Sequence, residues 1–179
     1  SPRAGSGAAK PLVLGSTDDE FTMAMGDAGA ALRWVPRGLL LGRLGVPRER
    51  RRGFLADNAD VVALGKVRLA GRVLSDRMFR TTVVRIAAAR GDAPTWVYRF
   101  SWPSGTFGFA EHCLDVPFFF DCLDAPAVEP LAGTHPPQAL ADELHAAAVA
   151  YIQNADPGWP RHDARGIARV WNTPTADKP

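Results

Sequence analysis

Three short apolar segments, each followed or preceded by turn-forming residues, predict the strands of a sheet. Residues 11–14 (Pro-Leu-Val-Leu) end at a small, polar and acidic turn that covers residues 15–20. Residues 95–100 combine aromatic and β-branched side chains, which favour extended backbone. Residues 167–171 predict a final short strand. We therefore expect at least three strands in one sheet.

Helical spacing of apolar residues occupies the segments between these strands. Residues 75–90 predict a helix that Ser75 caps and Gly91 terminates. Its predicted apolar face consists of Met78, Phe79, Val83 and Ile86. A second helix is predicted over residues 138–152, and several short helices over residues 21–74. Helices that alternate with strands predict an α/β fold class.

Composition and charge exclude several classes of protein. The 179 residues are 46% hydrophobic and 22% charged, the balance of one ordinary domain with a buried core. Residues 1–10 and 173–179 predict a loose lead-in and a frayed polar tail. The apolar runs are too short to cross a bilayer, so no membrane span is expected. The net charge of +2 does not indicate a nucleic-acid surface, and the arginines in residues 48–52 predict a solvated helix face.

Glu20 and His112 are the residue pair with the clearest potential chemistry. Each follows a predicted strand, where an α/β sheet places its functional loops. A carboxylate that accepts a hydrogen bond from one imidazole nitrogen fixes the tautomer of the ring. It also stabilises the imidazolium that forms when the other nitrogen takes a proton. The spacing alone favours the alternative, in which Glu20 caps the following helix and His112 is a core histidine with satisfied hydrogen bonds.

Cysteine and histidine usage indicates no further reactive site. We expect Cys113 and Cys122 to be two buried thiols rather than a bridge, and we favour a cytoplasmic over a secreted location. A Cys113–His112 nucleophile is not expected, because adjacent residues on an extended segment point to opposite sides. Surface positions are expected for the histidines without metal-ligand spacing, His135, His145 and His162. Packing roles are expected for Trp96, Trp102, Trp159 and Trp171.

Five segments, in the same order along the chain, resemble motifs of type-B carboxylesterases, the esterase/cholinesterase family of α/β-hydrolases. Residues 14–21, Leu-Gly-Ser-Thr-Asp-Asp-Glu-Phe, resemble the stretch that carries the acid in this family. Residues 108–120 resemble its histidine motif. The other segments are a helix start at 75–80, a strand at 98–102, and a late helix and turn at 137–141 and 154–160. The similarity is greatest to bacterial members of the para-nitrobenzyl-esterase type.

The resemblance implies that residues 1–179 are the C-terminal part of an α/β-hydrolase sheet with packed helices. It makes Glu20 the acid and His112 the general base of a catalytic triad. It places Asp115 in a supporting position three residues after the histidine. Trp102 and Phe107, which precede the histidine motif, are candidates for lining a substrate pocket.

The function implied by the resemblance is hydrolysis of small-molecule carboxylic esters through a serine acyl-enzyme, without a cofactor or a metal. In α/β-hydrolases the nucleophile precedes the acid in the sequence. Only nineteen residues precede Glu20, and neither Gly-x-Ser-x-Gly nor His-Gly-Gly-Gly occurs in the chain. The serine and the oxyanion hole are therefore expected on an N-terminal esterase portion, without which this chain is inactive. The alternative is a non-catalytic, esterase-like binding module.

Overall fold

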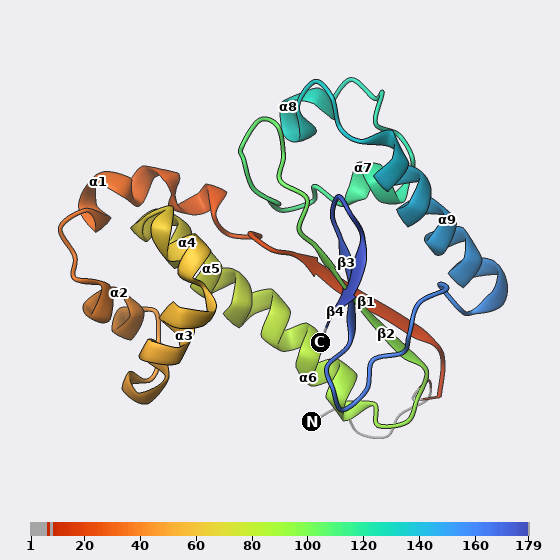
Figure 1. The fold of residues 1–179 in the computed structure, drawn as a ribbon, viewed down its shortest axis with the longest axis horizontal. Helices are drawn as coiled ribbons and strands as arrows, with labels where there is room; N and C mark the ends of the chain where they lie inside the picture. The colour runs from red at the N-terminus through yellow and green to blue at the C-terminus, as the bar shows by residue number, and fades with distance from the viewer. Residues whose placement is uncertain (1–6, 8, 179) are drawn as a thin grey trace.

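The strands form one four-stranded sheet in which neighbours in space are also neighbours in the chain (Figure 1). They are β1 (Leu12–Thr17), β2 (Thr95–Phe100), β3 (Ala168–Trp171) and β4 (Ala176–Lys178). β1, β2 and β3 run parallel, whereas β4 pairs antiparallel with β3. This computed structural model describes residues 7 and 9–178, so most of the predicted lead-in lies outside the described residues.

The three strands predicted from the sequence are confirmed. β2 occupies the predicted residues 95–100, and β3 lies within the predicted residues 167–171. β1 is longer than predicted and continues to Thr17, so it includes half of the polar turn. The extension brings the carboxyl end of β1 level with Phe100, the last residue of β2.

The frayed tail predicted for residues 173–179 is wrong. Residues 176–178 form β4, in which Ala176 pairs with Val170. Arg169 Nε donates a hydrogen bond of 2.6 Å to Asp177 Oδ1 across the ladder. Residues of low strand propensity thus become a strand through pairing and a cross-strand ion pair, which the local sequence does not reveal.

Short helices follow β1, as predicted, and the three longest described helices lie before and after β2. Between β1 and the crossover to β2 lie η1 (Met23–Ala28), α1 (Gly29–Leu32), α2 (Arg37–Arg43), η2 (Arg48–Arg50), α3 (Arg51–Asp57) and α4 (Ala59–Ala63). The crossover consists of α5 (Lys66–Ser75), a π-helical turn η3 (Asp76–Arg80) and α6 (Thr81–Ala89). After β2 come α7 (Val116–Phe119), α8 (Glu129–Ala132) and α9 (Gln138–Asn154), the last of which confirms the helix predicted at 138–152. No described helix is long and apolar enough to span a membrane.

The helix start predicted at Ser75 is wrong, because Ser75 lies inside a continuous helical segment. Its φ and ψ angles are −57° and −46°, and its hydroxyl donates to the Gly71 carbonyl oxygen at 2.9 Å. The same hydroxyl accepts the N–H of Phe21 at 3.0 Å. Ser75 therefore connects this helix to the loop after β1 instead of capping the helix.

The buried face of α6 agrees only in part with the predicted face. Val83 and Ala87 are buried against Val97 of β2, whereas Met78 and Ile86 are exposed. The π-helical turn η3 is wider than an α-helical turn, so residues before and after it do not share one 3.6-residue phase. The prediction that one helical period runs unbroken from Met78 to Ile86 is therefore wrong.

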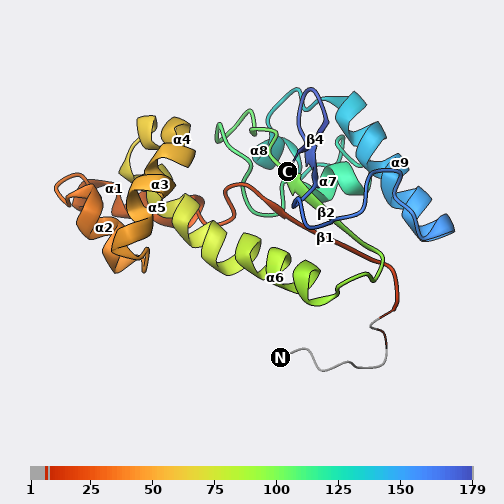
Figure 2. The same ribbon diagram turned by 60° about the horizontal axis from the view of Figure 1, so that its bottom comes forward.

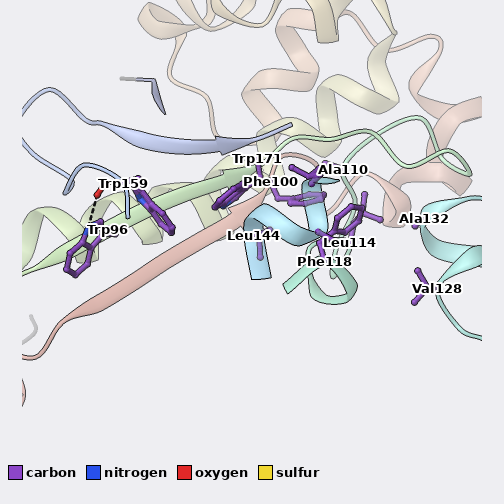
Figure 3. Packing of buried hydrophobic residues seen from close by; sticks show 12 residues of the cluster. Trp96, Phe100, Ala110, Leu114, Phe118, Val128, Ala132, Leu144, Trp159 and Trp171 are labelled. Carbon is purple, nitrogen blue, oxygen red and sulfur yellow. Dashed lines mark hydrogen bonds between the residues drawn. The ribbon is translucent and has the colours of Figure 1, made fainter. Parts of the chain in front are cut away.

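Helices cover both faces of the sheet (Figure 2). α6 packs on one face, and α7 and α9 pack on the other. The second face holds the larger core, in which Trp96 Nε1 donates to the Trp159 carbonyl oxygen at 3.0 Å (Figure 3). Its large buried side chains are Trp96, Phe100, Leu114, Phe118, Trp159 and Trp171. The packing roles predicted for the tryptophans are confirmed, with Trp102 partly buried against this core.

Gly15 lies opposite Tyr98 in the β1–β2 ladder, and a Cβ added there would lie 2.1 Å from Tyr98 Cε1. The ring cannot shift freely, because its hydroxyl donates to Asp115 Oδ2 at 2.8 Å. We predict that Gly15→Ala lowers the free energy of unfolding by about 1–3 kcal/mol, measured by urea denaturation. Gly53→Ala in α3 is the control, because its added Cβ meets no atom within 4 Å. Equal destabilisation by both variants would contradict the prediction.

Candidate active site

The loop after β1 carries three consecutive carboxylates, residues 18–20, which we call the acidic turn. Its backbone is fixed to two neighbouring segments. The Asp18 N–H donates to the Phe100 carbonyl oxygen at 3.0 Å, and the Asp19 N–H donates to the Ala110 carbonyl oxygen at 2.9 Å. Phe100 ends β2, and Ala110 belongs to the loop that follows it. Because β1 and β2 are parallel neighbours, the loops at their carboxyl ends meet at one edge of the sheet.

Glu20 and His112 are separated by 92 positions in the chain and are in direct contact. His112 Nδ1 lies 2.5 Å from Glu20 Oε2, and the Thr17 N–H donates to Glu20 Oε1 at 2.9 Å. The Glu20 side chain is 7% exposed, whereas that of His112 is 62% exposed. The exposed ring rules out a core histidine at position 112. The carboxylate is thus held inside the protein and the imidazole is presented at the surface.

This contact defines which ring nitrogen of His112 is basic. An ionised carboxylate is only an acceptor, so the proton of the contact resides on Nδ1. In the neutral ring, Nε2 is then the nitrogen that accepts a proton. A carboxylate in this position can stabilise the imidazolium that forms when Nε2 takes a proton from a hydroxyl. The pair therefore has the chemistry of a general base and its orienting acid.

Asp115 connects the loop that carries His112, residues 101–115, which we call the histidine loop, to β2. The Tyr98 hydroxyl donates to Asp115 Oδ2 at 2.8 Å. Burial raises the pKa of Asp115, the hydrogen bond from Tyr98 opposes this rise, and the Glu20 charge adds to it. Burial, together with the Asp115 charge, also raises the pKa of Tyr98, so the phenol remains a donor. Asp115 thus has its own partner on the strand beneath the loop.

Glu111, the residue before His112, is 1% exposed. Its Oε1 has no hydrogen-bond partner among the residues that the structure describes. Burial raises the pKa of Glu111 to about 7. A buried carboxylate without compensating donors costs free energy whenever it is ionised. The histidine loop therefore contains a buried titratable group next to the exposed imidazole.

The raised pKa of Glu111 makes stability depend on pH. The folded state holds this proton more tightly than the unfolded state, so the stabilising contribution is complete below pH 4.5 and lost as the pH rises through about 7. We predict that Glu111→Gln matches the unaltered chain at about pH 4 and is more stable by about 3 kcal/mol at pH 8. Urea denaturation at both pH values measures the difference. Glu49→Gln, at an exposed position, is the control, and a Glu111→Gln effect independent of pH would refute the prediction.

Four arginines, which we call the arginine network, surround the acidic turn: Arg68, Arg72, Arg80 and Arg99. Asp18 accepts two hydrogen bonds from Arg99, at 3.0 and 2.8 Å, and one from Arg80 Nη2 at 3.0 Å. Burial raises the pKa of Asp18, but the Arg99 hydrogen bond and the charges of Arg99 and Arg80 outweigh burial and lower it. Asp18 is therefore an ionised residue that three hydrogen bonds from arginines hold in place.

Asp19 lies farther from its arginines than Asp18 does, and it also accepts a hydrogen bond within its own loop. Its Oδ2 lies 3.5 Å from Arg68 Nη2 and 3.4 Å from Arg72 Nη2, while its Oδ1 accepts the Thr22 hydroxyl at 3.0 Å. The Arg68 guanidinium also lies over the Phe109 ring, 4.2 Å from its centroid. The arginines of α5 thus contact both the acidic turn and the histidine loop.

The candidate substrate-lining residues have other aromatic neighbours. Trp102 is half-buried, and its ring centroid lies 5.2 Å from that of Phe118. Phe107 is exposed, and its ring centroid lies 6.0 Å from that of Phe109. The Phe79 ring, in contrast, lies beside the candidate pair, with its centroid 5.9 Å from that of the His112 ring. A substrate-lining role for Trp102 and Phe107 stays a prediction.

Both cysteines are free, as predicted, but their predicted burial is wrong. Cys113 is exposed and Cys122 is half-buried. Cys113 has a φ of 64°, so a tight turn follows His112, and the extended backbone predicted there is also wrong. Partial burial and the charges of Asp115 and Glu20 raise the pKa of Cys113, which disfavours a nucleophilic thiolate.

The remaining histidines lie apart from the pair. His135 is exposed, whereas His145 and His162 are half-buried and place Nδ1 2.9 Å and 3.0 Å from the carbonyl oxygens of Phe119 and Ile167. The predicted surface position is therefore confirmed for His135 alone. Within the described part of the chain, no three His, Cys, Asp or Glu side chains are grouped as metal ligands would be.

Sequence reasoning missed Glu111, Tyr98 and the arginine network. Part of the signal lies in β2, where consecutive side chains point to opposite faces. Tyr98 therefore reaches Asp115 on one face while Arg99 reaches Asp18 on the other. Nothing in the sequence separates a buried Glu111 from a solvated one, because loop packing decides its burial.

A mainly parallel sheet between helices, with a carboxylate and a histidine on the loops after adjacent strands, is the arrangement of the α/β-hydrolase fold. Solved carboxylesterase structures have this fold, and the chain matches a part of it. The predicted fold class is thereby confirmed. No protein-family model matches the sequence.

The structural matches include the Geobacillus stearothermophilus carboxylesterase EST55 at pH 6.2, with a TM-score of 0.73 and 24% sequence identity over 94% of this chain and 38% of that one. A PNB esterase matches with a TM-score of 0.64 and 20% identity over 94% of this chain and 36% of its own. An esterase from Clostridium hathewayi that hydrolyses aliphatic aromatic polyesters has a TM-score of 0.64 and 18% identity, over 97% and 38%. This chain therefore spans less than two fifths of the length of these esterases.

Proposed function

We propose that this chain is the part of a serine carboxylesterase that supplies the acid and the histidine of the triad. The observation that carries the proposal is the 2.5 Å contact between Glu20 and His112, which joins two loops at the carboxyl end of the sheet. The α/β-hydrolase fold supports it, because this fold presents its acid and histidine on such loops. The substrates we propose are carboxylic esters of small molecules.

In the proposed mechanism, His112 Nε2 takes the proton of a serine hydroxyl as the serine oxygen attacks the ester carbonyl carbon. Glu20 keeps the other nitrogen protonated and stabilises the imidazolium. The imidazolium then gives its proton to the departing alcohol, which leaves an acyl-serine. A water molecule, deprotonated in turn by His112, attacks the acyl carbon of the acyl-serine. The bond to the serine oxygen then breaks, the imidazolium returns its proton to that oxygen, and the carboxylic acid leaves.

The serine belongs to a second portion of the enzyme in this proposal, because the sequence contains no Gly-x-Ser-x-Gly segment. β1 supports this division. It is an edge strand, and among the described residues it pairs with β2 alone. The unpaired backbone groups of an edge strand are a template for a further strand. We propose that the serine-bearing portion adds its own strand beside β1 and covers the exposed His112 ring.

Ester hydrolysis by the separate and combined portions tests this function. We predict that this chain alone does not hydrolyse a short-chain p-nitrophenyl ester, and that turnover appears when it is co-expressed with the serine-bearing portion. A fluorophosphonate probe is expected to label the serine of that portion in the complex. Turnover by this chain alone would contradict the division of the triad. A stable complex without turnover or labelling would favour the non-catalytic binding module.

A further inference from the structure

The arginine network contacts the residue that lies two positions before Glu20. We infer that Asp18, held by Arg99 and Arg80, is a positioning residue that directs the Glu20 carboxylate toward His112. This inference rests on the proposed function, because positioning matters only if the pair is catalytic. It assigns to the ion pairs a role in the geometry of the active site rather than in stability alone.

Asp18 is attached to two elements at once. Its side chain is 11% exposed and accepts the two-pronged guanidinium of Arg99 from β2. It also accepts Arg80 Nη2 from η3 at 3.0 Å. Its backbone N–H is bonded to Phe100, the neighbour of Arg99. Two-pronged arginine–carboxylate contacts fix direction as well as distance, so Asp18 has little freedom to rotate.

The other end of the acidic turn is also fixed. The Phe21 N–H donates to the Ser75 hydroxyl of α5 at 3.0 Å. Thr22 is packed so closely on Gly71 that an added Cβ would lie 2.6 Å from Thr22 Cα. Glu20 therefore lies between two anchored points, Asp18 and Phe21. Release of either point would move the carboxylate, and a displacement of about 1 Å can reduce catalysis about 100-fold.

Asp76 provides a matched control for the positioning role. It shares Arg80 with Asp18, through a contact of 2.5 Å between Arg80 Nη1 and Asp76 Oδ1. Burial raises the pKa of Asp76, whereas the arginines outweigh burial and lower the pKa of Asp18. Asp76 belongs to η3 and is not part of the acidic turn. Asp76→Asn therefore changes the same charge near the same arginine without releasing the turn.

The experiment measures the tautomer of the His112 ring by its ¹⁵N chemical shifts at about pH 8, in the unaltered chain and in Asp18→Asn, Arg99→Lys and Asp76→Asn. We expect the Nδ1–H tautomer to dominate in the unaltered chain and in Asp76→Asn, and to lose its dominance in Asp18→Asn and Arg99→Lys. In the reconstituted esterase, Asp18→Asn is expected to lower kcat by about 10–100-fold with KM unchanged. If Asp18→Asn does not fold, Arg99→Lys tests the positioning role instead. Lysine keeps the positive charge but cannot make the two-pronged contact with Asp18.

Unchanged His112 tautomers in the folded Asp18 and Arg99 variants would overturn the positioning role. An equal loss of the Nδ1–H tautomer in Asp76→Asn would also overturn it. The arginine network would then affect His112 only through the stability of the whole fold. A missing Nδ1–H tautomer in the unaltered chain would contradict the Glu20–His112 contact, and with it the proposed function. Intact tautomers together with an inactive reconstituted esterase would contradict the proposed function alone.

Discussion

Replacement of His112 by asparagine is expected to reduce kcat/KM of the reconstituted esterase by at least about 10⁴-fold. Asparagine retains a donor for the Glu20 carboxylate but has no basic nitrogen, so the serine keeps its proton and stays a poor nucleophile. Because the ring is exposed, its removal leaves no cavity, and the folded state is preserved. The rate of p-nitrophenyl ester hydrolysis at pH 8 measures the loss.

His135→Asn is the matched control for this variant. His135 is also exposed, and it lies outside the two loops that carry Glu20 and His112. We expect its kcat/KM to equal that of the unaltered esterase. A decrease of less than tenfold in His112→Asn would mean that another residue takes the proton. Equal decreases in both variants would also contradict a specific role of His112.

Phe118→Ala is expected to produce the largest loss of stability, about 3–5 kcal/mol. The Phe118 side chain is fully buried, with its ring centroid 5.0 Å from Phe100 and 5.2 Å from Trp102. Truncation leaves a cavity between α7 and β2, and the rigid aromatic neighbours cannot fill it. For a chain of this length the midpoint of thermal unfolding should fall by about 10 °C. Calorimetry measures both quantities.

Phe120→Ala is the control within the same run of three phenylalanines. Phe120 is 64% exposed, so its truncation is expected to change the free energy of unfolding by no more than about 0.5 kcal/mol. Similar losses for Phe118 and Phe120 would contradict the core in which α7 packs against β2. The comparison also tests whether the packing of α7 supports the histidine loop, because that loop leads directly into α7.

The elements that could be predicted from the sequence are those whose local pattern agrees with their final packing. Five of the six residues 95–100 are aromatic or β-branched, and the segment becomes a strand with two packed faces. The long helix α9 keeps one apolar period from Leu140 to Leu144 and beyond. In both elements local propensity and burial favour the same structure, so the prediction is confirmed.

The elements that could not be predicted depend on partners far away in the chain. Ser75 has the residue type of a helix cap, but its hydroxyl binds Phe21 and Gly71 within a longer helix. Residues 176–178 have little strand propensity and acquire their structure from β3. The residues next to Ser75 do not indicate its hydrogen bonds, and the residues next to 176–178 do not indicate the pairing with β3.

The candidate site was predictable only at its two chemically distinctive residues. Glu20 and His112 follow strands, so their positions at one edge of a parallel sheet follow from the fold class. The anchors of Glu20 are less accessible to sequence reasoning. Arg80 and Arg99 reach Asp18 from positions 62 and 81 residues away, and no local spacing relates them.

A double-variant cycle tests most directly whether Glu20 and His112 act as one unit. The kcat/KM of the reconstituted esterase is measured for Glu20→Gln, His112→Asn and the combined variant. Because the proposed catalytic effect of the Glu20 carboxylate acts through the imidazole, we predict that the combined variant loses no more activity than His112→Asn alone. Losses that multiply in the combined variant would contradict the pairing, since each residue would then contribute without the other.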